Sequence, residues 1–194
     1  MRLQSCLACA ALMAWPALAV GQCPTATDLQ TGVRLSTDTP HFSALYSMLP
    51  NGHLQVQRLN EGGATIMTTS TPHPLTKISS TTNAPSFVTT STDDIDHLDE
   101  VLQWSSSVEN MVGGTRIPSG TVNVTFLDHS DVTIADCTHD TWRVEVTNAP
   151  RLLPQTTSVN HYAPTLGLII AIQIMDDTGR MASALTFDRI EAVQ

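Results

Sequence analysis

Short runs in which apolar and polar residues alternate follow one another along most of the chain, and turn residues separate them. Alternation with a period of two is typical of β-strands that bury one face. In the clearest pair, 44–48 and 53–59, Leu54 and Val56 alternate with polar residues. Asn51-Gly52 between the two runs supplies the positive φ angles of a tight turn. The pattern therefore predicts an antiparallel hairpin here.

The same pattern continues to the C-terminus. It predicts further strands at 64–69, 75–79, 101–106, 121–127, 132–136, 141–147, 158–162, 166–175 and 182–189. We expect residues 128–131 to form the turn of a second hairpin, because apolar residues alternate on both sides of them. Connections this short do not allow crossovers, so about ten to twelve strands should form an antiparallel meander.

One segment has helical spacing instead. Ile95, Leu98, Val101 and Leu102 fall on one helical face, Thr92 can cap the helix, and aspartates occupy its first turn. The predicted class is all-β with one short helix, an antiparallel meander curled into a half-barrel or a barrel. A sandwich of two sheets is the alternative, because a twisted sheet must close, fold over or curl.

The N-terminus has the layout of a secretory signal. Arg2 precedes the uncharged, Ala- and Leu-rich stretch 3–20, which contains Ala17-Leu18-Ala19 as a small-residue cleavage site. We predict a signal peptide at 1–19 and a single β-rich domain at 20–194, with cleavage after Gly21 as the alternative. The mature protein should then be periplasmic or secreted.

The mature chain has no predicted transmembrane segment, because polar residues and a proline interrupt the N-terminal apolar stretch. Lipidation of Cys23 is disfavoured, since Gln22 occupies the position that needs a small residue. Cys6 and Cys9 leave with the signal, so Cys23 and Cys137 remain, and in an oxidising compartment we expect a disulfide between them. Two free thiols, or a reactive Cys137 beside His139, are the alternatives.

The charge balance disfavours polyanionic partners. The chain has 18 acidic residues against nine Lys and Arg, and Lys77 is the only lysine. Loss of Arg2 with the signal brings the formal net charge from −9 to about −10. Nucleic acids and anionic membrane surfaces require clustered basic residues, so both are poor partners.

Two stretches carry a weak family resemblance. Residues 162–169, running on to 187–190, resemble the ending of uncharacterised exported bacterial β-domains, and Cys23-Pro24-Thr25-Ala26 with 32–35 is similar to their mature N-termini. The resemblance implies the half-barrel of lipoprotein-carrier-like envelope proteins, whose concave face holds acyl chains. It carries over no functional residue.

Candidate chemistry is sparse. The acidic run 93–100 offers carboxylates for calcium, but it lacks EF-hand spacing, and an exposed helix start explains it. Cys137, His139 and Asp140 come nearest to a zinc or cysteine-nucleophile cluster, which the expected disulfide would remove. His73 and His129 lie in predicted turns and should be exposed. We therefore predict no catalytic residue, no metal site and no cofactor.

Two hypotheses about function remain. The favoured one is a non-catalytic envelope protein that binds an apolar small molecule, a lipid or an envelope protein partner on its curled sheet. An exported hydrolase or metal-dependent enzyme, with a site assembled from distant strands, is the other, and a purely structural role stays open. Trp104 and Trp142 should pack in the core. The candidate ligand face, most of which we expect to be core, consists of Leu54, Val56, Ile66, Val122, Val124, Val144, Val146, Leu168 and Ile170.

Overall fold

The computed structural model describes residues 23–76, 79–80, 86–89, 91–112, 115–151 and 154–193. The predicted signal peptide at 1–19 and its cleavage site lie outside these residues. The described chain consists mostly of antiparallel strands, with one short helix, α1 (Leu98–Val101), and two 3-10 turns, η1 (Ala26–Gln30) and η2 (Ile95–His97). The predicted all-β class is confirmed. No helix in these ranges has the length and apolar character needed to cross a membrane.

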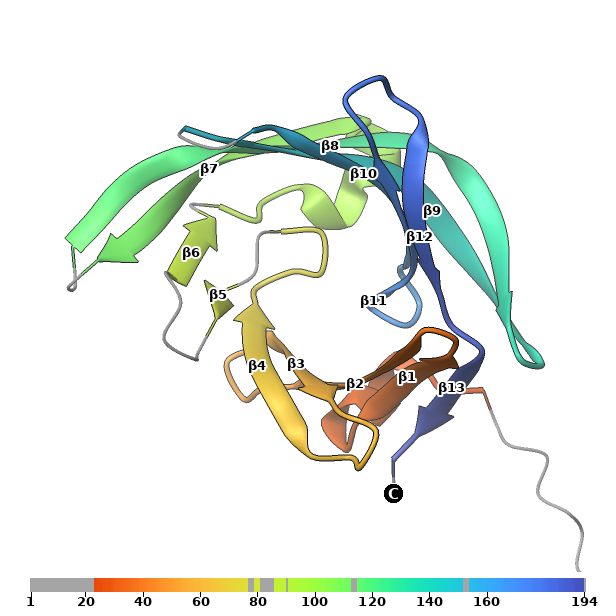
Figure 1. Cartoon of the computed structure of the whole chain (residues 1–194). Coiled ribbons are helices and arrows are strands. Elements are labelled where there is room, and N and C mark those ends of the chain that lie inside the picture. The colour runs from red at the N-terminus through yellow and green to blue at the C-terminus, as the bar shows by residue number, and fades with distance from the viewer. Residues whose placement is uncertain are drawn as a thin grey trace, which may run out of the picture.

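The strands form two sheets whose order follows the chain (Figure 1). The six-stranded sheet runs in the order β13 (Arg189–Ala192), β1 (Val33–Asp38), β2 (His41–Met48), β3 (Leu54–Leu59), β4 (Thr65–Thr71) and β5 (Ser79–Ser80). The seven-stranded sheet runs in the order β12 (Met181–Thr186), β11 (Leu168–Met175), β10 (Thr156–Ala163), β9 (Cys137–Pro150), β8 (Thr115–Ile134), β7 (Gln103–Val112) and β6 (Ser86–Thr89). The predicted meander is confirmed.

Neither sheet closes on itself within the described ranges, so the closed-barrel alternative is wrong. The seven-stranded sheet arches over the six-stranded one (Figure 1). Between β12 and β13, Phe187 is buried and the Asp188 carboxylate accepts hydrogen bonds from the Thr37 hydroxyl and the Asp38 N–H, at 2.7 and 3.1 Å. These contacts separate β12 from β13, which instead pairs with β1.

The first predicted hairpin is confirmed, because β2 pairs with β3 and Gly52 in the turn has φ 79°. The second predicted turn, at 128–131, is wrong: β8 continues through these residues and turns at Ala135-Asp136. A bulge between Phe126 and Asp128 shifts the register and lets the strand continue. Asp128 then meets the Arg143 guanidinium of β9 at 2.6 Å, which gives its carboxylate a partner across the strands.

The strand predicted at 75–79 is only partly present. Leu75 and Thr76 lie in a turn after β4, residues 77–78 lie outside the described ranges, and only 79–80 form a strand. The helical segment lies where it was predicted, although Asp94 rather than Thr92 is the N-cap of η2. The helix is also shorter than the spacing suggested, because Leu102 adopts a left-handed conformation and ends it.

Two hydrophobic clusters make up the core. The first packs the inner side of the seven-stranded sheet against Leu75, Ile95 and Leu98, and it includes both Trp104 and Trp142, as expected. The second joins residues of both sheets, among them Leu35 of β1 and Ile170 of β11. Seven residues of the candidate ligand face belong to these buried clusters, namely Leu54, Val122, Val124, Val144, Val146, Leu168 and Ile170. Val56 is partly buried, whereas Ile66 is 57% exposed.

Cys23 and Cys137 are joined by a disulfide, with Cα atoms 5.5 Å apart. The bond ties the start of the described chain to the first residue of β9, across a sequence separation of 114 residues. Because Cys137 is 7% exposed, the bond is almost entirely buried at that end. A bonded sulfur has no thiolate to offer, so the reactive-cysteine alternative does not apply to this form of the protein.

Candidate functional site

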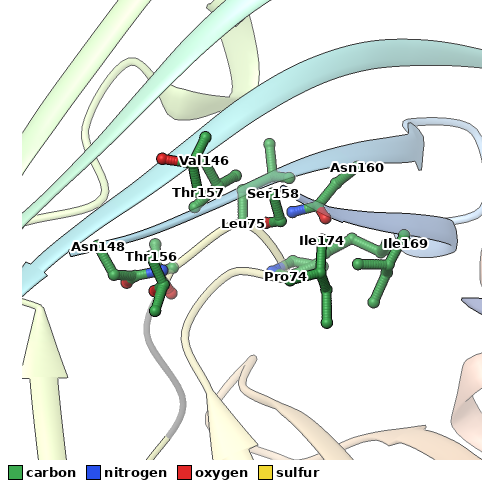
Figure 2. Close-up of a pocket in the computed structure, with 12 residues that line it drawn as sticks. Pro74, Leu75, Val146, Asn148, Thr156, Thr157, Ser158, Asn160, Ile169 and Ile174 are labelled. Carbon is green, nitrogen blue, oxygen red and sulfur yellow. The ribbon is translucent and has the colours of Figure 1, made fainter. Parts of the chain in front are cut away.

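A cavity of about 500 Å³ lies between the seven-stranded sheet and residues 72–76, which follow β4 and are here called the strap. Figure 2 shows the lining residues around one space, with Pro74 and Leu75 contributed by the strap. Its walls are formed by Pro74, Leu75, Thr76, Val146, Asn148, Thr156, Thr157, Ser158, Asn160, Ile169, Ile172 and Ile174. The volume falls within the range of small-molecule sites, about 300–1,000 Å³.

The strand register explains why these side chains share one wall. Val146 of β9 pairs with Ser158 of β10, which pairs with Ile174 of β11, so the three form one row. Asn160 and Ile172 belong to the adjacent row. Residues two apart on a strand point to the same face, so both rows face the strap. The wall is apolar apart from hydroxyl and amide groups, and no charged residue lines it.

The strap is held by its own hydrogen bonds. The Thr71 and Thr76 hydroxyls each donate to the His73 carbonyl oxygen at 2.7 Å, and the Thr76 N–H donates to the same oxygen at 3.0 Å. The Leu75 N–H donates to His73 Nδ1 at 3.2 Å. A loop can enter an apolar interior only when its backbone polar groups find partners. The Leu75 and Thr76 N–H groups and the His73 carbonyl meet that requirement, so the strap forms a preformed wall.

His73 anchors the strap, and it is buried, so the prediction that it is exposed is wrong. Its ring lies 5.2 Å from the Tyr162 ring, and Nε2 lies 3.3 Å from Asp96 Oδ1. Because Nδ1 accepts from Leu75, the neutral imidazole carries its proton on Nε2. Burial lowers the pKa of His73 to about 4, although the Asp96 carboxylate acts in the opposite direction. The prolines on both sides of His73 are typical of an exposed turn, so nothing in the sequence indicates that this histidine is buried.

Asn160 is the buried polar side chain of the cavity wall. It is 6% exposed, and its Oδ1 has no hydrogen-bond partner among the described residues. Its row neighbours Val144 and Ile172 are apolar. A buried acceptor that lacks a partner is destabilising, so a native structure that retains one calls for a physical reason.

Sequence reasoning found little of this wall, since Val146 is the only lining residue on the predicted ligand face. The missed signal lies in β10, where Thr156, Ser158 and Asn160 alternate in period two, yet all three are polar. This pattern predicts a strand with one polar face exposed to solvent, whereas here that face lines the cavity.

The predicted chemical candidates do not converge on the cavity. His139, two residues after Cys137, is buried, and desolvation lowers its pKa. His129 Nδ1 lies 3.7 Å from Asp140 at an exposed position. In the acidic run, Asp96 Oδ1 lies 3.3 Å from His73 Nε2. Within the described ranges, no three His, Cys, Asp or Glu side chains gather as a metal site requires.

One contact bears on the enzyme hypothesis. Ser130 Oγ lies 3.1 Å from His161 Nδ1, which is the spacing of a nucleophile and its base. Burial is the main cause that lowers the pKa of His161, and the Arg143 charge adds to it. However, strand alternation places His161 on the opposite face of β10 from Asn160, away from the cavity. Ser130 also shares its hydroxyl with Thr141 at 3.0 Å, so the contact belongs to cross-strand pairing.

Comparison with known proteins adds little to this description. No protein-family model matches the chain, and no curated protein matches it. A similar solved structure is the crystal structure of a protein described as a candidate lipoprotein from Parabacteroides distasonis, with a TM-score of 0.37 and 11% sequence identity. The alignment covers 82% of this chain and 94% of that one. A similarity this weak carries no conclusion about shared function.

Proposed function

We propose that this protein is exported to the cell envelope or beyond and holds an apolar small molecule or lipid chain in the cavity beneath β9, β10 and β11, without catalysing a reaction. The observation that carries the proposal is the cavity itself, about 500 Å³ in volume and lined by isoleucines, Val146 and the leucine of the strap. An apolar ligand that fills it removes this surface from water, at roughly 25 cal/mol per Å².

Export is supported by two independent features. The disulfide between Cys23 and Cys137 is typical of oxidising compartments outside the cytosol. The residues before Cys23 have the layout of a secretory signal. Expression of the full chain in a bacterial host, followed by fractionation and N-terminal sequencing, tests this part. A periplasmic product that begins at Val20 or Gln22 supports export, and an unprocessed cytoplasmic product contradicts it.

Native mass spectrometry of the purified protein tests ligand binding. We expect a co-purifying apolar adduct, or uptake of the neutral dye N-phenyl-1-naphthylamine with increased fluorescence. Ser158→Phe places a ring inside the cavity and should abolish both signals. The matched control is Thr121→Phe, at an exposed position of β8 in the same sheet, which should keep them. Equal binding by the two variants would place the ligand elsewhere and refute the proposed site.

A further inference from the structure

Three large apolar side chains remain exposed where α1 meets β8. Val101 and Leu102, at the C-terminal end of α1, are 45% and 53% exposed, and Leu127 of β8 is 41% exposed. The Phe126 N–H donates to the Leu102 carbonyl oxygen at 2.9 Å, so the two segments adjoin. A single exposed leucine is ordinary, whereas apolar side chains that gather on a surface mark an interaction site. We call Val101, Leu102 and Leu127 the leucine patch.

Leu102 also has an unfavourable backbone conformation. Its φ of 65° and ψ of −25° are left-handed, and its N–H closes the helix by donating to the Leu98 carbonyl oxygen at 2.8 Å. Glycine is usual at such a position because it has no Cβ, and a bulky residue adopts this conformation only at a cost in free energy. Burial of the Leu102 side chain within the described structure does not offset that cost, which points to a contact outside the molecule.

The surroundings of the patch are acidic. In α1, neither Asp99 nor Glu100 has an ion-pair partner among the described residues. The segment 91–112 contains no Lys or Arg. On the side of β8, the Arg143 guanidinium is already paired with Asp128 at 2.6 Å. The patch is therefore an apolar surface beside uncompensated negative charge.

From these features we infer that the leucine patch binds a segment of another protein whose apolar side chains are flanked by lysines or arginines. Such a partner buries the exposed leucines and pairs its cations with Asp99 and Glu100. A second copy of this chain would bring these carboxylates against their own kind, and an anionic membrane surface would also be repelled. The inference is independent of the cavity and of its ligand.

The probe is a short, fluorescently labelled amphipathic peptide with leucines along one helical face and lysines along the other. It is titrated with the mature protein, and fluorescence anisotropy gives the affinity at low and at physiological salt. Binding should weaken as salt is added, because part of it is electrostatic. The same peptide with glutamate in place of lysine should not bind.

Leu102→Gly removes the side chain and suits the left-handed backbone, so the melting temperature should stay close to that of the wild type. Peptide binding should nevertheless weaken about tenfold, the loss expected when the exposed half of a leucine is no longer buried. Leu102→Asn, whose residue type also tolerates this conformation, should behave alike. Ile66→Thr, at a 57% exposed position of β4 in the other sheet, is the matched control and should bind as the wild type does.

The charge contribution needs its own pair of variants. Asp99→Asn with Glu100→Gln should weaken binding at low salt and reduce its dependence on salt. Asp177→Asn with Glu61→Gln removes the same charge from exposed turns elsewhere and should leave both unchanged.

The outcomes distinguish the possible occupants. Equal peptide binding by the wild type and both Leu102 variants overturns the patch as a binding site. Binding that requires Leu102 but is indifferent to Asp99 and Glu100 overturns the basic partner. Dimerisation of the wild type in analytical ultracentrifugation, lost in Leu102→Gly, assigns the patch to a second copy, and Leu102-dependent binding to phosphatidylglycerol vesicles assigns it to a membrane. Either result also overturns the inference.

Discussion

Acid should weaken this fold through His73, and the effect can be isolated from other titrations. The imidazole is neutral in the native state, accepts a hydrogen bond from the Leu75 N–H and packs on Tyr162. Protonation of Nδ1 replaces this acceptor with a donor that faces another donor. It also charges a ring that is 8% exposed, and the Asp96 carboxylate compensates only in part.

The size and sign of the effect follow from linkage. The native pKa of about 4 lies below the ordinary value of 6.5. Between these two values the unfolded chain binds more protons than the native one, so stability falls as the pH decreases. Each pKa unit of difference between the two states corresponds to about 1.4 kcal/mol, so the free energy of unfolding should fall by about 3 kcal/mol between pH 6.5 and pH 4. Well above pH 6.5 the His73 imidazole is neutral in both the native and the unfolded state, so this contribution no longer changes with pH.

The assay is urea unfolding of the wild type and His73→Asn at pH 7, 5.5 and 4. The Asn Oδ1 can accept the Leu75 N–H, and it does not titrate in this range. His73→Asn should be less stable at pH 7 because packing on Tyr162 is lost, but between pH 7 and pH 4 it should lose about 3 kcal/mol less than the wild type. His97→Asn, an exposed histidine in η2, is the control and should follow the wild type. Parallel curves for the wild type and His73→Asn would refute the argument.

Three further predictions concern stability and the cavity. Replacing Cys23 and Cys137 by serine should lower the free energy of unfolding by about 4–5 kcal/mol at most, measured by urea unfolding, because the lost bond closes a long loop. Gly120→Ala should lower the melting temperature, since φ is +150° and the new Cβ would overlap the Ala149 carbonyl oxygen. Gly179→Ala, with φ +77° but open space around it, should lower it less. Leu75→Ala should cost about 2–5 kcal/mol and weaken dye binding, because Leu75 is both core and cavity wall.

The local alternation of apolar and polar residues was sufficient to predict the meander and the first hairpin. The register of β2 with β3 depends on a turn and on side chains a few residues apart, all of which are visible in one window of sequence. The helical segment could be placed for the same reason, since Ile95 and Leu98 both bury against neighbouring strands. The length of the helix could not be predicted, because Leu102 ends it in a left-handed conformation that is uncommon for leucine.

Features that depend on residues far apart in the chain could not be predicted from the sequence. The polar composition of residues 128–131 is typical of a turn. The ion pair between Asp128 and Arg143, which joins neighbouring strands, cannot be seen in that segment alone. His73 resembles a turn histidine until Asp96 and Tyr162 surround it. In both cases a polar side chain is accommodated by a residue at least 15 positions away, which no local window contains.

The cavity stays open because the strap is held in a fixed conformation. A sheet face lined by Ser158 and Thr156 does not fill the space above it as leucines would, and such a space would ordinarily collapse as the neighbouring segment moved inward. The strap resists this movement, because the hydroxyls of Thr71 in β4 and of Thr76, together with His73, fix its backbone in one conformation. A preformed site of this kind requires little ordering when a ligand enters, so binding retains most of the free energy of apolar burial. The cavity therefore depends both on His73, which holds the strap in place, and on the small side chains of β10, which leave the space unfilled. Loss of His73 should weaken ligand binding even though His73 does not line the cavity.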